Sequence, residues 1–164
     1  MNIAQTISGA ASCLIGGRWQ PAASGATLPV LCPSDGKAFD EIARGGAEEV
    51  DAAVAAARTA FDTGVWGKLT ATERGRLLSK LGEAVAAEHE ALARLEARDT
   101  GKPLTQARTD ITCTARYFEY YGGAADKLHG QTIPFLNGYQ VQVIREPHGV
   151  TGHIIPWNYP AQMV

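Results

Sequence analysis

The spacing of apolar and polar positions changes several times along this 164-residue chain. Between Cys13 and Gly46, short apolar runs alternate with clusters of Gly, Pro, Ser and Asp. Gly16-Gly17 and Asp35-Gly36 are typical of tight turns, because these residue types adopt the backbone conformations that such turns need. This first stretch therefore predicts three or four short antiparallel strands.

Two helices are predicted next, because the apolar positions take on the period of an α-helix. The first begins near Ala47 with acidic residues in its opening turn, which suits the helix dipole, and Gly64 is its expected end. The second opens at Thr70, which fits a capping box with Glu73. Its apolar stripe continues to Gly101, so one unbroken helix is expected there.

A third helix and a hairpin follow. Pro103 is suited to the first turn of the helix, which is expected to break near Gly122-Gly123 and to end by Gly130. Asn137-Gly138 then separates two extended apolar runs, and a hairpin over 131–146 is predicted because both residues tolerate positive φ. A two-stranded ribbon is marginal alone, so this hairpin needs a surface to lie on, such as another subunit.

The last segment predicts a strand, a tight loop and the start of a helix. Residues 150–155 are the strand, and Pro160 is a favourable first-turn residue for the helix. The order of strands, helices, ribbon and strand-to-helix unit indicates an α/β protein that ends on the first unit of a βαβ array.

The amino-acid composition of the chain bears on which partners it is able to bind. The chain is 45% hydrophobic and 20% charged, with a formal net charge of −2, and this balance argues against nucleic acid or an anionic membrane as the main partner. No apolar run is long enough to span a bilayer, and the N-terminal stretch lacks the basic region of a secretory signal. The three scattered cysteines favour a reducing, cytoplasmic setting, and the four histidines show no metal-binding spacing.

Asn158 is the most informative polar residue. It stands where the predicted strand meets the predicted helix, so its side chain is a candidate N-cap for that helix. The other interpretation places the amide in the cleft at the carboxyl end of the strand, where open α/β sheets bind ligands. An amide N–H there is able to stabilise a developing oxyanion. The cysteines and His153 lack an evident activating partner and are interpreted as structural.

Several long segments resemble one enzyme family. Residues 149–160 read GVTGHIIPWNYP, residues 96–103 read EARDTGKP, and residues 115–134 read ARYFEYYGGAADKLHGQTIP. In this order they resemble the N-terminal portion of the NAD(P)-dependent aldehyde dehydrogenase superfamily. The resemblance extends over nearly the whole chain.

The resemblance implies a fold and a division of the chain. Residues 1–128 would be the N-terminal part of a cofactor-binding domain, made of a β-arm and helices. Residues 129–148 would be the oligomerisation hairpin. Residues 149–164 would be the first strand and helix start of a Rossmann-like core, so the chain is expected to be a truncated, N-terminal part of the fold.

The resemblance also implies the chemistry. Asn158 would hold the oxyanion that forms when a cysteine attacks an aldehyde substrate, and Ile154, Ile155, Pro156 and Trp157 would line the site of NAD or NADP. The product would be a carboxylic acid, and the protein a homo-oligomer through its hairpin. The family's nucleophilic cysteine and general base have no counterpart in this sequence, so the chain alone is expected to be inactive. A non-catalytic oligomerisation or partner-binding module is the alternative function.

Overall fold

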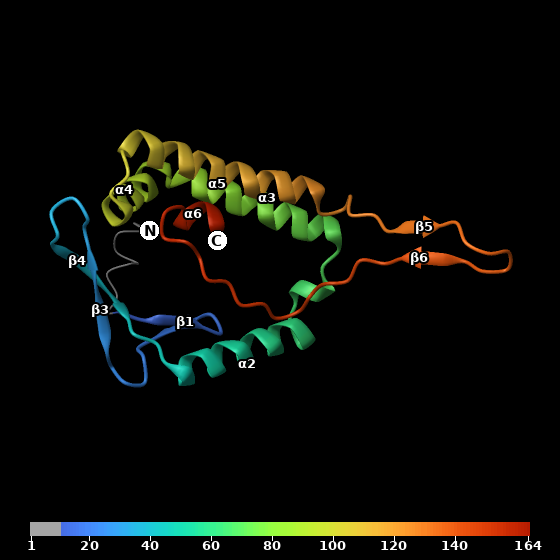
Figure 1. Cartoon of the computed structure of the whole chain (residues 1–164), viewed down its shortest axis with the longest axis horizontal. Coiled ribbons are helices and arrows are strands. Elements are labelled where there is room, and N and C mark those ends of the chain that lie inside the picture. Colours follow the sequence, from blue (N-terminus) through green and yellow to red (C-terminus); the bar gives the residue numbers. More distant parts are fainter. Residues whose placement is uncertain (1–10) are drawn as a thin grey trace.

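The computed structural model describes residues 11–164. The first residues of the predicted 1–128 unit, and most of the stretch considered as a signal sequence, lie outside the described residues. The described chain has a mixed α/β architecture: a β-arm and the helices lie around the C-terminal segment, and a hairpin projects away from them (Figure 1).

The N-terminal arm consists of two antiparallel strand pairs. β1 (Cys13–Ile15) pairs with β2 (Arg18–Gln20), and β3 (Thr27–Leu31) pairs with β4 (Ala38–Ala43). Gly16 and Gly17 form the first turn with φ of 59° and 77°, a conformation that favours glycine. The prediction of three or four short antiparallel strands is therefore confirmed.

Helix α2 (Ala47–Thr63) lies beside the arm and ends at Gly64, as predicted, although none of its residues is buried. The carboxylate of Glu49 accepts hydrogen bonds from Gly46 N at 2.6 Å and from Ala23 N at 2.8 Å. These bonds lower the pKa of Glu49 and tie the helix to the arm. A short 3₁₀ turn, η1 (Trp66–Lys68), leads to the next helix.

The second predicted helix is two helices, α3 (Ala71–Ala87) and α4 (His89–Thr100). Their outer ends follow the prediction: Thr70 and Glu73 form the capping box, and Gly101 caps α4 with φ of 76°. The expectation of one unbroken helix is wrong because the chain turns at Glu88. His89 Nε2 bonds Arg108 O on the following helix at 2.8 Å, so α4 takes its own direction against that neighbour.

Helix α5 (Leu104–Ala124) follows Pro103 and packs against both α3 and α4. It ends at Ala124, directly after Gly122-Gly123, so the predicted break near these glycines and the predicted end by Gly130 are both confirmed. Gly122 lies against α3 so closely that a Cβ there would be 2.8 Å from Gly75 O. The buried apolar side chains of this layer are small except for Ile111, which lets the helix axes approach closely.

The hairpin of β5 (Gln131–Ile133) and β6 (Val141–Val143) projects away from the helices (Figure 1). Asn137-Gly138 lies at its tip, where Tyr139 N donates to Leu136 O at 3.1 Å. Gly138 has φ of 85°, but no other residue type in the described chain has positive φ. The tip is therefore not the expected turn with two positive φ values; it has the sign pattern of a type II turn.

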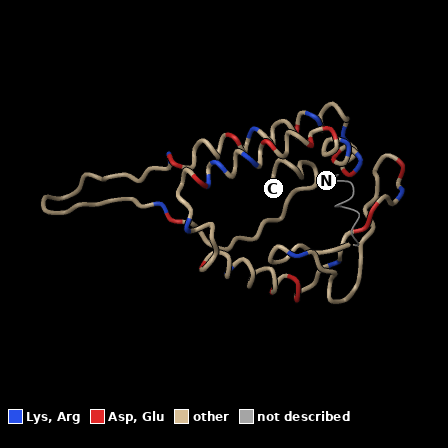
Figure 2. Tube along the Cα trace, turned by 180° about the vertical axis from the view of Figure 1, so that it is seen from behind, with Lys and Arg blue, Asp and Glu red and all other residues tan. Residues whose placement is uncertain are grey.

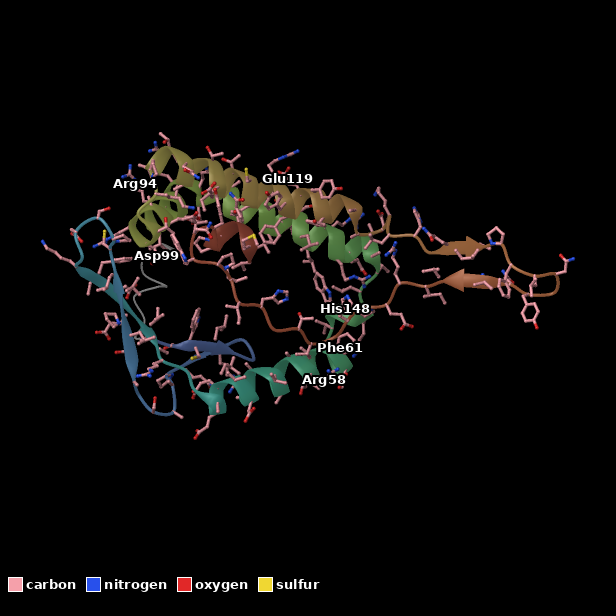
Figure 3. The ribbon with its side chains drawn as sticks, viewed as in Figure 1. Arg58, Phe61, Arg94, Asp99, Glu119 and His148 are labelled. Carbon is pink, nitrogen blue, oxygen red and sulfur yellow. The ribbon has the colours of Figure 1, made fainter. Side chains whose placement is uncertain are left out.

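The predicted strand over 150–155 is the largest error. These residues have no regular secondary structure, although α6 (Pro160–Met163) begins at Pro160 as predicted. A strand forms only where a neighbour accepts and donates its main-chain hydrogen bonds, and the described residues place no strand beside this segment. The chain lies against Arg58 and Phe61 of α2 at Gly149, just before this segment, and the segment then crosses to the helical layer (Figure 1 and Figure 3).

Candidate functional site

The site is organised around Lys102, which follows the left-handed Gly101 between α4 and α5. Its Nζ donates to Glu96 Oε1 at 2.5 Å, to Asp110 Oδ2 at 2.7 Å and to the main-chain oxygen of Asn158 at 2.8 Å. An ammonium has three N–H donors, so these three contacts use all of them. Lys102 thus connects two helices to the C-terminal segment.

This charge cluster is buried. The side chain of Lys102 is 10% exposed, and those of Glu96 and Asp110 are 4% and 6% exposed. Burial pulls the pKa of Lys102 down, but the hydrogen bonds and charges of the two carboxylates outweigh it and raise the pKa above 10.5. Glu96 Oε2 has no hydrogen-bond partner among the described residues. One ammonium faces two carboxylates, so the cluster is net negative when all three groups are ionised.

Further contacts hold the C-terminal segment against the same helices. Gln162 Nε2 donates to the second oxygen of Asp110 at 2.8 Å. The ammonium of Lys102 lies 4.6 Å from the centre of the Tyr159 ring, a cation–π arrangement, and Gln106 Nε2 donates to the Tyr159 hydroxyl at 3.3 Å. Residues 158–162 are therefore fixed by α4, α5 and the turn between them.

The side chain of Asn158 takes no part in these contacts. The N-cap of α6 is Tyr159, and no side chain caps the helix, so Asn158 does not act as an N-cap here. Asn158 is exposed and its amide has no hydrogen bond within residues 11–164. It borders a hollow of about 240 Å³ that is also lined by Thr100, Lys102 and Trp157. The side-chain amide thus lies beside this hollow without a hydrogen-bond partner among the described residues.

The four apolar residues before Asn158 present an open surface. Ile154 is fully exposed and Trp157 is 77% exposed, while Pro156 is exposed and Ile155 is half-buried.

The other candidates from the sequence lie elsewhere: the three cysteines are free and none of them lines the hollow, and His153 pairs with Thr151 at 2.9 Å. Within the described chain, no group of His, Cys, Asp and Glu is arranged to hold a metal ion. None of its helices has the length and apolarity that a bilayer crossing requires.

Comparison with known proteins decides the family. The model of the aldehyde dehydrogenase family matches residues 19–164. The chain belongs to the aldehyde dehydrogenase family. This agrees with the resemblance of its sequence motifs.

Individual aldehyde dehydrogenases show how far the similarity extends. The chain is 49% identical to aldehyde dehydrogenase family 2 member B4 of Arabidopsis thaliana over 92% of its own length and 28% of that protein. It is 43% identical to human retinal dehydrogenase 2 over 91% of its own length. The NAD⁺ complex of an aldehyde dehydrogenase from Bacillus cereus superposes with a TM-score of 0.91 at 37% identity, over 98% of this chain and 33% of that one. The chain thus spans about 30% of the length of the aldehyde dehydrogenases it matches.

The buried charge cluster is the part of the site that the sequence analysis missed. Glu96 and Lys102 lie in the segment 96–103 that resembles the family, but the sequence predicts no role for either of them or for Asp110. A weak signal exists, since Asp110 directly precedes Ile111 on the buried face of α5 and a carboxylate on such a face needs a partner. The identity of that partner depends on how the helices pack.

Proposed function

We propose that this family member forms the N-terminal part of an enzyme that oxidises an aldehyde to a carboxylic acid with NAD⁺ or NADP⁺. The observation that carries the proposal is the exposed amide of Asn158 beside a hollow, on main chain whose carbonyl accepts a hydrogen bond from Lys102. When a nucleophile adds to an aldehyde, its carbonyl oxygen becomes negative. An amide N–H aimed at that oxygen stabilises the charge.

The residues present fit the nicotinamide end of NAD⁺ or NADP⁺ but not its phosphates. Ile154 and Trp157 expose apolar surface next to Asn158, and with Ile155 and Pro156 they would form a wall against the nicotinamide ring. The described chain has no Gly-rich strand-to-helix turn for the phosphates. NAD⁺ or NADP⁺, when bound, supplies the acceptor for the hydride. The nucleophile is assigned to none of Cys13, Cys32 and Cys113, so the isolated chain is proposed to be inactive.

Activity measurements test the proposal. The chain alone, given acetaldehyde and NAD⁺, should produce no NADH absorbance. The same chain, joined in place of the matching segment of the Arabidopsis thaliana relative, should produce it. In that chimera, Asn158→Ala should lower kcat by about 10²- to 10³-fold, the cost of losing one oxyanion donor. Asn137→Ala, at the hairpin tip, is the matched control and should leave kcat unchanged. An active chimera that tolerates Asn158→Ala would refute the role of the amide.

A second function, self-association, is favoured by the hairpin. Residues 128–144 contain no Lys, Arg, Asp or Glu, and Figure 2 shows this uncharged ribbon extending from the charged helices. It exposes several large apolar side chains, namely Phe135, Leu136, Tyr139 and Ile144. An exposed apolar patch of this kind marks an interaction site. We propose that the hairpin over 131–146 joins copies of the chain, whether or not the assembly is catalytic.

Size-exclusion chromatography with light scattering, together with circular dichroism, tests the hairpin. A discrete folded oligomer is expected for the chain, and a smaller folded species for the double variant Phe135→Ser/Ile144→Ser. Val65→Ser, at an equally exposed apolar residue after α2, should behave as the unmodified chain does. A hairpin variant that keeps the original oligomer size would exclude this surface. A disordered aggregate in place of the oligomer would argue against an independent association module.

A further inference from the structure

We infer that Lys102 is a positioning residue for Asn158: Glu96 and Asp110 fix its ammonium, and the ammonium in turn fixes the peptide that carries the amide. This inference rests on the proposed function of Asn158. It assigns to the buried cluster a part in the geometry of the oxyanion site as well as in the stability of the helical layer.

The position of the ammonium is set by two separate helices. Glu96 belongs to α4 and Asp110 to α5, and each contributes one short contact to Nζ. Because both carboxylates are buried on packed helices, the lysine has little freedom to move. Its third donor points at the carbonyl of Asn158, so the location of that carbonyl follows from the packing of α4 on α5.

The segment that carries Asn158 has no comparable anchor of its own. Residues 150–158 form no helix or strand. Within the described chain, the bond from Lys102 to the Asn158 oxygen is the one hydrogen bond that ties their main chain to another element. Gln106 and Asp110 contact only the side chains of Tyr159 and Gln162, after Asn158. Removal of the lysine donor therefore releases the Asn158 peptide first.

The expected consequence is catalytic. A catalytic group displaced by about 1 Å loses on the order of 10²-fold in rate, because the donor no longer meets the developing charge. The side-chain amide of Asn158 remains present in a Lys102 variant, but its mean position changes. The three N–H donors of Lys102 are used by Glu96, Asp110 and the Asn158 carbonyl, so its effect on the reaction passes through Asn158 in this scheme.

Backbone order in the chain itself gives a first test, independent of activity. In the unmodified chain, the heteronuclear NOE of the Trp157, Asn158 and Tyr159 amides should match that of α5. Lys102→Met, which keeps an unbranched side chain but removes the ammonium, should lower these values while those of α3 and α5 stay the same. Arg108→Met is the matched control, since it removes an exposed ion pair between the same two helices. Unchanged NOE values in Lys102→Met would overturn the inference.

A second variant covers the case in which Lys102→Met unfolds the chain, since it leaves two buried carboxylates without their cation. E96Q/K102M removes one carboxylate together with the ammonium, so the net charge of the ionised cluster is unchanged. The same local loss of order at Trp157 to Tyr159 is expected. Full order at these amides in the double variant would again overturn the inference.

A double-mutant cycle in the chimera separates positioning from plain structural support. Lys102→Met should lower kcat by about 10- to 100-fold when Asn158 is present. In the Asn158→Ala background it should cause no further fall, because the group it positions is gone. Falls that multiply would overturn the inference and leave Lys102 a structural residue. If Asn158→Ala alone has no effect on kcat, the proposed function fails; the NOE result still decides whether Lys102 holds the peptide.

Discussion

The apolar side chains on the inner face of helix α5 are buried, whereas those on the hairpin that follows the helix are exposed. The inner face carries Ala107, Ile111 and Ala115, which are buried against α3 and α4. Beyond its C-terminal end, the hairpin carries side chains of similar apolarity, such as Phe135 and Ile144, which are 64% and 74% exposed. The difference is that the helices supply each other's partners, whereas the hairpin strands supply only each other's main-chain hydrogen bonds.

This contrast shows what each region is able to do alone. Apolar burial is the dominant favourable contribution to folding, so the helical layer should hold most of the stability of the chain. An uncharged ribbon with exposed aromatic and aliphatic side chains contributes little to stability until another surface covers it. The hairpin is accordingly expected to govern association, and the helices to govern unfolding.

The largest expected effect is on the free energy of unfolding, and it is tested by replacing one isoleucine in each region. Ile111→Ala should lower the free energy of unfolding by about 2–5 kcal/mol, because it leaves a cavity in the helical core. Ile144→Ala, the matched control on the hairpin, should change it by no more than about 0.5 kcal/mol. Urea unfolding followed by circular dichroism measures both. Equal losses for the two variants would mean that the hairpin is part of the stabilising core.

The next largest effect on stability is expected from alanine substitutions at two adjacent glycines of α5. A Cβ on Gly122 would meet Gly75 O and Ser79 Oγ at 2.8 Å each, whereas a Cβ on Gly123 meets nothing within 4 Å. Gly122→Ala should therefore destabilise the chain by about 1–3 kcal/mol through overpacking. Gly123→Ala should stabilise it by about 0.5–1 kcal/mol, since alanine is the better helix former. The same urea titration distinguishes them; a stabilising Gly122→Ala would show that α3 and α5 are further apart.

Local features of this fold were predictable from the sequence. The capping box at Thr70, the helix ends at Gly64 and Gly101, and the hairpin around Asn137-Gly138 depend on residues close together in the chain. Asn158 could be singled out as a candidate for the same reason, because its place just before Pro160 is a local property. Each of these features follows from backbone conformation and nearby hydrogen bonds.

Features that depend on packing were not predictable. The break at Glu88 accompanies a contact with another helix, the hydrogen bond between His89 and Arg108 of α5. The strand over 150–155 failed because a strand depends on its neighbours more than on its own pattern. Lys102 was missed because Glu96, Asp110 and the Asn158 carbonyl meet it only after three elements have packed together. The sequence thus singled out Asn158 as a candidate, whose role stays a prediction, but it did not predict the contact of its carbonyl with Lys102.

The smallest expected effect concerns the outer face of the helical layer. There Glu90 accepts hydrogen bonds from Arg108 and pairs with Arg94, which points away from the core (Figure 3). The hydrogen bonds from Arg108, followed by the charges of Arg108 and Arg94, lower the pKa of Glu90 from 4.5 to about 2. A carboxyl whose pKa is lower in the folded state adds stability above its unfolded pKa and loses it as pH falls through the folded value.

Glu90→Gln should therefore lower the urea midpoint slightly at neutral pH, and the difference from the unmodified chain should shrink between about pH 4.5 and pH 2. The effect should be small and should weaken in high salt, because the pair is exposed to solvent. Glu83→Gln, on α3 and without an ion pair among the described residues, is the control and should show no such difference. If the difference in urea midpoint between Glu90→Gln and the unmodified chain grew toward low pH, the prediction would be wrong. Ionisation of Glu90 would then not be what stabilises the folded chain. Together with the isoleucine pair, this result would show that the helical layer owes its stability to its buried face and only slightly to its charged one.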